Sequence, residues 1–138
     1  MNDVVVGGRP RALPDRAVRR IVRSVLAGER ARASISVTFL GRDAMRELNA
    51  RFKGRDRPTD VIAFPLRGPG RVCIGDIYLC PWVARREAAA RRRPVREELI
   101  RILVHGILHV LGHEHPEDGA RERSAMWRRQ ERYVEALA

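Results

Sequence analysis

The sequence predicts an α+β fold in which a small mixed sheet of about four strands packs with about five helices. Strand-like segments come mostly early in the chain and helix-like segments mostly late. One helical segment near residues 95–111 is apolar on nearly every side, which is typical of a buried central helix. A length of 138 residues suits a single core, so we expect residues 1–138 to form one domain.

Four segments have the patterns of β-strands. Residues 4–6 are valines, and residues 34–39 alternate polar and apolar side chains, as a half-buried strand does. Residues 61–64 are largely apolar and come after a charged loop. Residues 72–79 follow a Gly-Pro-Gly turn at 68–70, and they complete the predicted sheet.

The first two helices lie between these strands. Pro14 begins the first helix, which carries an apolar stripe and ends at Gly28. The second covers residues 42–52 and is closed by Gly54. We expect its apolar side to be formed by Met45, Leu48, Asn49 and Phe52.

Three more helices follow the last strand. The third runs from Pro81 to about residue 92, and Pro94 begins the central helix. Glu97 and Glu98 fall in the first turn of the central helix, where carboxylates complement the helix dipole. The last helix is predicted to run from about residue 116 or 117 toward Leu137.

All four histidines of the chain lie around the end of the central helix, and His105, His109 and His115 form the pattern His-x3-His-x2-Gly-x2-His. Residues four apart share one helix face about 6 Å apart, so His105 and His109 can point at one ion. Gly112 favours a left-handed helix end, after which His115 can return to the same point. Three nitrogen ligands and an open position are typical of catalytic zinc. A cluster of ordinary core histidines is the less favoured alternative, because buried imidazoles need polar partners.

The spacing overlaps the HExxHxxGxxH pattern of one group of zinc proteases. In those enzymes the Glu after the first His is the general base. Gly106 stands at that place here, so a protease would lack its base. The residues therefore favour a metal ion that activates water or polarises an anionic oxygen, chemistry that suits phosphodiesters.

The chain is strongly basic, with a net charge of +11 and a pI near 11.4. This balance favours a polyanionic partner, nucleic acid above all, over a merely basic surface. No apolar stretch approaches the ~18 residues of a membrane helix, and the N-terminus lacks the features of a secretory signal.

The two cysteines indicate the redox setting. Cys73 and Cys80 are seven residues apart in a strand-like run, which would place them on opposite faces. Neither a disulfide nor a CxxC site is favoured, and we expect both to be small buried side chains. A reducing, cytoplasmic location without a membrane partner is the expectation.

Three blocks of the sequence resemble one known family. Residues 105–115, HGILHVLGHEH, are similar to the motif HGxLHLxGYDH of the YbeY family, bacterial endoribonucleases also called rRNA maturation factors. Residues 48–65, LNARFKGRDRPTDVIAFP, are similar to the family's LNxxYRxKDxPTDVLSFP, and residues 75–77 match its GDI strand. The blocks come in the family's order, so the resemblance covers nearly the whole chain.

The resemblance implies specific roles for the motif residues. It places one Zn²⁺ per chain on His105, His109 and His115. The family's basic residue linked to RNA cleavage, usually Arg, falls on Lys53, which keeps the charge but loses the planar fork that grips a phosphate. Arg51 or Arg55 could take over that contact, and the helix end would also suit Lys53 as a solvated residue.

Other positions are left with two interpretations. The residues before the last His are His113 and Glu114 in place of Tyr-Asp, and the family pattern assigns the ligand role to His115 rather than His113. Glu114 either orients a ligand ring or is an exposed loop residue. We expect Asp60 to bond backbone groups at a turn. Aromatic residues that could stack bases, but are expected to pack within the fold, are Trp82, Trp127 and Tyr133.

The function implied by the resemblance is zinc-dependent cleavage of single-stranded RNA. The expected setting is maturation of the 3′ end of small-subunit rRNA and ribosome quality control, with RNA, the small ribosomal subunit and assembly factors as partners. The nucleophile, water or the RNA 2′-hydroxyl, is left open. The alternatives are a non-catalytic assembly factor stabilised by its metal, and a zincin-like hydrolase of peptides or small substrates.

Overall fold

The computed structural model describes residues 3–8, 12–67, 73–113 and 124–138. Within these ranges four strands form one sheet in the order β1-β2-β4-β3. The strands are β1 (Asp3–Gly7), β2 (Ala33–Phe39), β3 (Val61–Arg67) and β4 (Cys73–Leu79). β1, β2 and β4 are parallel, and β3 runs antiparallel to β4 at one edge. The prediction of an α+β fold with a mixed sheet is confirmed.

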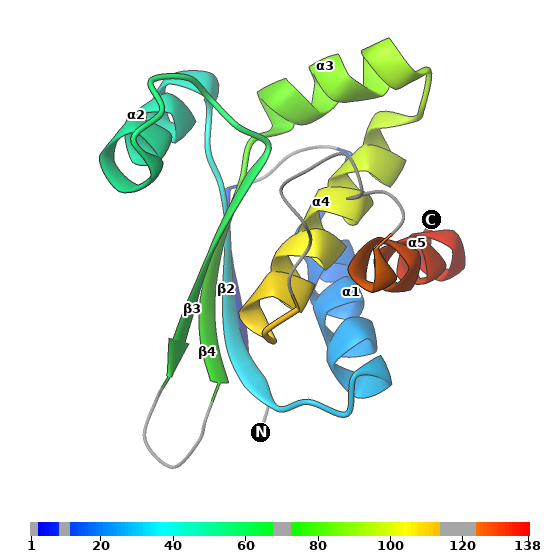
Figure 1. Cartoon of the computed structure of the whole chain (residues 1–138). Coiled ribbons are helices and arrows are strands. Elements are labelled where there is room, and N and C mark those ends of the chain that lie inside the picture. The colour runs from blue at the N-terminus through cyan, green and yellow to red at the C-terminus, as the bar shows by residue number, and fades with distance from the viewer. Residues whose placement is uncertain (1–2, 9–11, 68–72, 114–123) are drawn as a thin grey trace.

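The described part of the chain also contains five helices, most of which lie on one side of the sheet (Figure 1). They are α1 (Asp15–Gly28), α2 (Arg42–Lys53), α3 (Pro81–Arg91), α4 (Val95–Val110) and α5 (Ala125–Leu137). α4 packs against β3 and β4, while α1, α3 and α5 pack against α4. α4 is buried along nearly its whole length, as its all-round apolar sequence predicts.

The sheet has two differently covered faces. Alternate residues of β2, such as Ile35 and Val37, are buried in the main core beneath α1 and α4. The opposite face carries a smaller buried cluster near α2, formed by Met45, Ile62 and Cys80. Because side chains alternate along a strand, β3 contributes to both faces.

Helix α2 departs from its predicted apolar side at its last turn. Met45 and Asn49 are buried, and the Asn49 side-chain amide donates to the Arg57 carbonyl at 2.8 Å, which holds the following loop. Phe52, which the sequence places on the same side, is 56% exposed. Phe52 therefore lies at an exposed end of this side, with its ring centroid 5.3 Å from that of Phe64.

Helix α5 begins later than predicted. Ser124 has an extended backbone, and its hydroxyl accepts a hydrogen bond from the Trp127 amide at 3.1 Å, so it caps a helix that begins at Ala125. The predicted start near residue 116 or 117 lies outside the described residues, and the extended conformation of Ser124 rules out a continuous helix from there.

The two cysteines and the described helices can be compared with what the sequence predicts for disulfides and membrane spans. Neither cysteine forms a disulfide. Cys80 is fully buried, whereas Cys73 is only half-buried. Each packs with a different apolar cluster, in agreement with opposite faces. Among the described helices, none has the length and apolar character needed to cross a membrane.

Candidate metal centre

Helix α4 brings two of the predicted ligands together. His105 and His109 are one turn apart, and their ring centroids are 4.6 Å apart in an edge-to-face arrangement. His105 is buried and His109 half-buried. Both line a cavity of about 260 Å³ beside the edge strand β3. The i, i+4 spacing therefore gives the expected pair of imidazoles opening on one space.

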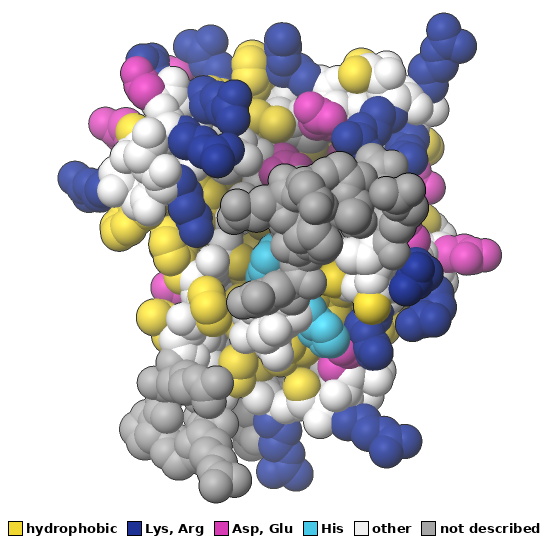
Figure 2. Space-filling view, viewed as in Figure 1, with side chains coloured by type: hydrophobic (Ala, Val, Ile, Leu, Met, Phe, Trp, Pro, Cys, Tyr) yellow, Lys and Arg dark blue, Asp and Glu magenta, His cyan; other side chains and the backbone are white. Residues whose placement is uncertain are grey.

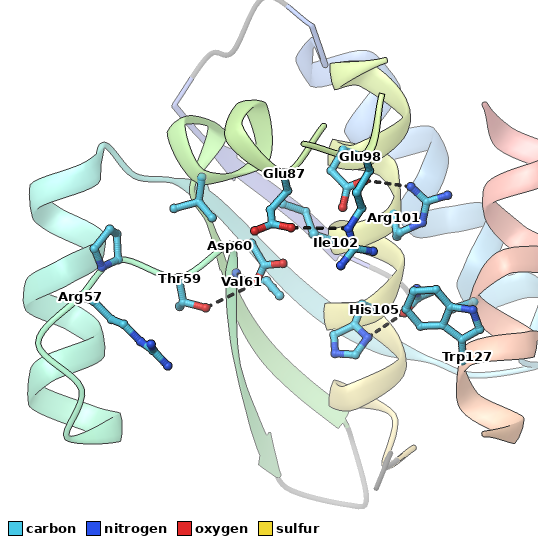
Figure 3. A pocket seen from close by; sticks show the side chains of 14 residues that line it. Arg57, Thr59, Asp60, Val61, Glu87, Glu98, Arg101, Ile102, His105 and Trp127 are labelled. Carbon is cyan, nitrogen blue, oxygen red and sulfur yellow. Dashed lines mark hydrogen bonds and ion pairs between the residues drawn. The ribbon is translucent and has the colours of Figure 1, made fainter. Parts of the chain in front are cut away.

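A buried amide from α5 fixes the His105 ring. The His105 Nδ1 lies 2.7 Å from the Gln130 Oε1, and Gln130 is 1% exposed (Figure 3). The Gln130 amide nitrogen donates to Glu131 at 3.1 Å, so its oxygen faces the imidazole. The amide oxygen can only accept, which places the ring hydrogen on Nδ1. Nε2 then carries the lone pair, as metal ligation requires.

This contact continues into an ionic network between α4 and α5. The Arg101 guanidinium donates two hydrogen bonds to the Glu131 carboxylate, each 2.9 Å, and a third to Glu98, also 2.9 Å. Burial raises the pKa of Glu131, but hydrogen bonds from Arg101 and Gln130 and the Arg101 charge outweigh it, so the net pKa is lowered. The network orients Gln130, and through it His105.

Gly106 explains why the protease base is missing. A Cβ built at this position would lie 2.9 Å from the Ile77 Cγ2 and 3.3 Å from the Val61 Cγ2. The helix therefore lies directly on the sheet at the residue after the first ligand, and a glutamate does not fit there. This close packing agrees with a metal site that has His ligands but lacks the glutamate base of zinc proteases.

The end of α4 forms the predicted left-handed turn. Gly112 has φ +98°, and the His113 amide donates to the Leu108 carbonyl at 2.9 Å. The His113 Nε2 lies 2.8 Å from the Glu29 carboxylate at the end of α1. His113 is thus engaged with α1. His115 and Glu114 lie outside the described residues.

Glu29, at the end of α1, forms hydrogen bonds with both α5 and this turn. It also accepts hydrogen bonds from the Tyr133 hydroxyl at 2.6 Å and from Arg129 at 2.9 Å. Burial raises its pKa, yet these bonds and that of His113 lower it overall. Burial and the same carboxylate raise the pKa of Tyr133 to about 12. Tyr133 therefore packs within the fold, as the sequence predicts.

Lys53 lies beside the histidine pair. It is exposed at the end of α2 and lines the same cavity as His105 and His109. Arg51 and Arg55 are exposed too, but they do not line this cavity. Of the three basic residues considered from the sequence, Lys53 has the position suited to a phosphate beside the histidines.

Asp60 stands where the two cavities of the site meet. It lines the histidine cavity and a neighbouring cavity of about 390 Å³, whose wall also contains His105, Arg57 and Trp127. Its Oδ1 accepts from the Val61 amide at 2.8 Å, so the prediction of a backbone-bonding role is confirmed. In Figure 3 His105 lies between the Thr59–Asp60 segment and Trp127.

The residues present fit a metal ion of the predicted kind. Two imidazoles are close together, one is held in the ligating tautomer, and their cavity is open to a phosphate-sized group. Within the described ranges no set of three His, Cys, Asp or Glu side chains is gathered for a metal, and the third predicted ligand, His115, falls in the gap at 114–123.

No local sequence pattern indicates two of the groups at this site. Gln130 meets His105 across 25 positions of the chain, and no periodicity within one helix reveals such a contact. Arg57 belongs to the charged loop before residues 61–64, and it lines the cavity of about 390 Å³. A buried polar residue in the last helix is the one available signal for Gln130.

Comparison with known proteins gives a consistent result. A sequence model for the family described as Endoribonuclease YbeY matches residues 10–138. The chain is 35% identical to Endoribonuclease YbeY of Thermotoga maritima over 103 residues, covering 75% of this chain and 67% of the relative. It is 39% identical to the protein of the same name from Salinispora tropica over 117 residues, covering 73% and 74%.

A further relative and a solved structure extend the match. The Endoribonuclease YbeY of Alkalilimnicola ehrlichii is 35% identical over 129 residues, covering 88% of this chain and 76% of the relative. A solution structure of a Thermotoga maritima protein superposes with a TM-score of 0.70 at 29% identity, covering 97% of this chain and 88% of that one. The similarity therefore includes the elements that carry the histidine pair and Lys53.

Proposed function

This chain belongs to the YbeY family of endoribonucleases, metal-dependent hydrolases of phosphodiester bonds, and we propose that it cuts single-stranded RNA with zinc as its metal. The proposed task is maturation of the 3′ end of small-subunit rRNA and ribosome quality control. Residues 1–138 would act as one catalytic domain in the cytoplasm, with the small ribosomal subunit and its assembly factors as partners.

One observation carries this proposal. The imidazoles of His105 and His109 stand 4.6 Å apart in a cavity that also receives the Lys53 side chain. Two imidazole side chains and one exposed cation in the same space suit a metal ion and the anionic phosphate that it acts on. The Gln130 contact supports it, because a ring held through Nδ1 is prepared to ligate through Nε2.

Each residue has a distinct proposed part. His105, His109 and His115 hold one Zn²⁺ per chain. When bound, zinc supplies Lewis-acid chemistry to the phosphodiester. Lys53 holds a phosphate oxygen by a charge-assisted hydrogen bond, and Gln130 fixes the His105 tautomer. Gly106, which leaves no room for a glutamate base, makes peptide hydrolysis the weaker alternative.

The surface charge supports RNA as the substrate. The net charge is +11, and Figure 2 shows Lys and Arg side chains over α2 and α3 and also along the side of α1 and α5, on the face where histidines are visible. Contacts of this kind release counterions, so RNA affinity is expected to fall steeply as salt rises. Flat salt dependence would count against RNA.

Cleavage of matched RNAs tests the proposal. Zinc-loaded protein should cut a labelled single-stranded RNA and leave the same strand intact in a perfect duplex. A companion substrate with 2′-deoxynucleotides separates the two nucleophiles: it resists cleavage if the 2′-hydroxyl attacks and is cut if water does. Folded, zinc-loaded protein that cuts no RNA would refute the enzyme and leave the assembly-factor alternative.

A further inference from the structure

An unusual apolar surface lies next to the candidate site. Among the described residues, the exposed large hydrophobic side chains are Phe52, 56% exposed, and Leu66, 49% exposed. Phe52 lies in the last turn of α2 and Leu66 lies on β3. We call the surface formed by Phe52, Phe64 and Leu66 the aromatic edge. Phe52 contacts the Phe64 ring, and Leu66 lies two positions further along β3, so the three side chains form an adjacent apolar patch of the kind that marks a binding surface.

Phe52 and Phe64 of the aromatic edge pack edge to face, and Phe64 packs in the same way on Tyr78. The Phe52 and Phe64 centroids are 5.3 Å apart with an interplanar angle of 70°, and Phe64 and Tyr78 are 6.0 Å apart at 77°. Phe64 is half-buried and supports Phe52 from behind. The exposed ring is therefore backed by packed neighbours, as a rigid stacking platform requires.

The aromatic edge and the histidine cavity flank one strand. Alternation along β3 puts Phe64 and Leu66 on the face toward α2, while Val61 and Ala63 pack toward α4. β3 is the last strand of the sheet, so no further strand of the described sheet separates the two surfaces. Lys53 joins them, because it lines the histidine cavity and its Nζ lies 6.0 Å from the Phe64 ring centroid.

Positive charge surrounds the exposed ring. Arg51, Lys53 and Arg55 are all exposed on either side of Phe52 in the chain. Asp56, the acidic residue of this segment, is paired with Arg46 at 2.8 Å. In Figure 2 hydrophobic and basic side chains lie together on the side of α2 and β3, next to the histidines. Cations along the backbone path and an exposed ring are the two components of single-strand nucleic-acid binding.

We propose that the aromatic edge stacks a nucleobase of single-stranded RNA next to the phosphate held by Lys53, with Phe52 as the contacting ring. This inference rests on the proposed function. A base in a duplex is already stacked and paired, so only an unpaired strand can offer its face to Phe52 while its phosphate lies at Lys53. The aromatic edge thereby gives a physical reason for preferring single strands.

The test compares an oligonucleotide with bases and one without. The probes are a 2′-O-methyl oligoadenylate, chosen to slow cleavage, and an abasic oligonucleotide of the same length and charge. Zinc-loaded protein and its Phe52→Ala variant are titrated at fixed salt by fluorescence anisotropy. Stacking is worth about 1–3 kcal/mol per base, so Phe52→Ala should weaken oligoadenylate binding about 5- to 150-fold. Its affinity for the abasic probe should stay unchanged.

Matched variants keep the result interpretable. Phe52→Trp should retain tight oligoadenylate binding, since it keeps a flat π surface, whereas Phe52→Leu keeps apolar bulk and should bind as weakly as Phe52→Ala. Thermal unfolding confirms that each variant is folded. Equal affinity of wild type and Phe52→Ala for oligoadenylate would overturn the proposal and leave the surface to a protein partner. Equal losses for both probes would overturn it as well.

The outcome also separates the two proposals. If wild type binds oligoadenylate through Phe52 but cuts no RNA, the proposed enzyme fails and the stacking platform stands. If wild type cuts RNA and Phe52→Ala binds as tightly as wild type, the platform alone fails.

Discussion

Two regions flank strand β3 and differ in almost every physical respect. At the α4–α5 interface the polar groups are buried and connected, from His105 through Gln130 and Glu131 to Arg101. At the aromatic edge the Phe52 ring and the neighbouring cations are exposed, and Lys53 is the last residue of α2. The first region fixes geometry, and the second presents adaptable contacts to a long flexible ligand.

This difference indicates which region serves metal binding and which serves RNA binding. A buried, connected network holds its side chains in one arrangement, which a metal centre needs. An exposed basic and aromatic surface adds affinity for RNA without constraining the metal. Changes in the first region should therefore alter metal binding and stability, while changes in the second should alter RNA contacts.

The largest expected effect comes from removing a ligand on the network side. His109→Ala should lower the rate of RNA cleavage by more than about 100-fold, because a metal site with one ligand fewer loses both affinity and geometry. RNA affinity should change little. Gel analysis of a labelled single-stranded RNA and anisotropy titrations measure the two quantities. A rate of RNA cleavage near that of wild type in His109→Ala would contradict the role of His109 as a metal ligand.

A matched pair of histidine variants sharpens the assignment of the third ligand. Zinc content should fall in His115→Gln and persist in His113→Gln, since His113 is engaged with Glu29. The reverse result would transfer the ligand role to His113.

Loss of the buried acceptor should have the next largest effect. Gln130→Met keeps the length of the side chain but cannot accept from the His105 Nδ1, so zinc affinity should fall about 10- to 100-fold. Gln130→Glu retains an acceptor oxygen and should lose less. Competition with a chelator of known zinc affinity measures both. Equal zinc affinity of Gln130→Met and wild type would mean that the network does not serve the metal.

Lys53→Ala tests the exposed side of the comparison. A hydrogen bond to a charged group is worth about 1.5–3 kcal/mol, so the rate of RNA cleavage should fall about 10- to 150-fold with zinc content unchanged. Lys53→Arg should restore most of the rate. Arg55→Ala, outside the histidine cavity, is the control and should lie near wild type. If Arg55→Ala cleaves RNA more slowly than Lys53→Ala, the phosphate contact belongs to Arg55 and not to Lys53.

The smallest effect concerns acid stability at the α4–α5 interface. The pKa of Glu131 is lowered below its usual value of 4.5, because the bonds and charge of Arg101 outweigh burial. A lowered pKa in the folded state gives stability that is fully present above pH 4.5 and is lost as pH falls through the folded-state pKa. The free energy of unfolding should therefore decline in acid, and less steeply in Glu131→Gln. Denaturant titrations at several pH values measure the free energy of unfolding. The same pH dependence in wild type and Glu131→Gln would contradict a lowered pKa of Glu131.

The sequence predicted those features that depend on local pattern. The i, i+4 spacing of His105 and His109, the left-handed turn at Gly112 and the buried character of α4 all follow from helix geometry and hydropathy. The strands agree within a few residues because turns and charged loops bound them.

Features that depend on tertiary context were not predictable in this way. The apolar stripe of α2 places Phe52 with Met45, but the last turn of the helix is left exposed. Gln130 and Glu29 reach their histidines from other helices, 25 and 84 positions away in the chain. Only the packing of α1, α4 and α5 brings these groups together.

Metal removal and return is the most direct test of the central claim. The rate of cleavage of one single-stranded RNA is measured before chelation, after chelation and after zinc is added back. We expect chelation to abolish cleavage and about one equivalent of zinc per chain to restore it. Undiminished cleavage by protein shown to be metal-free would contradict it.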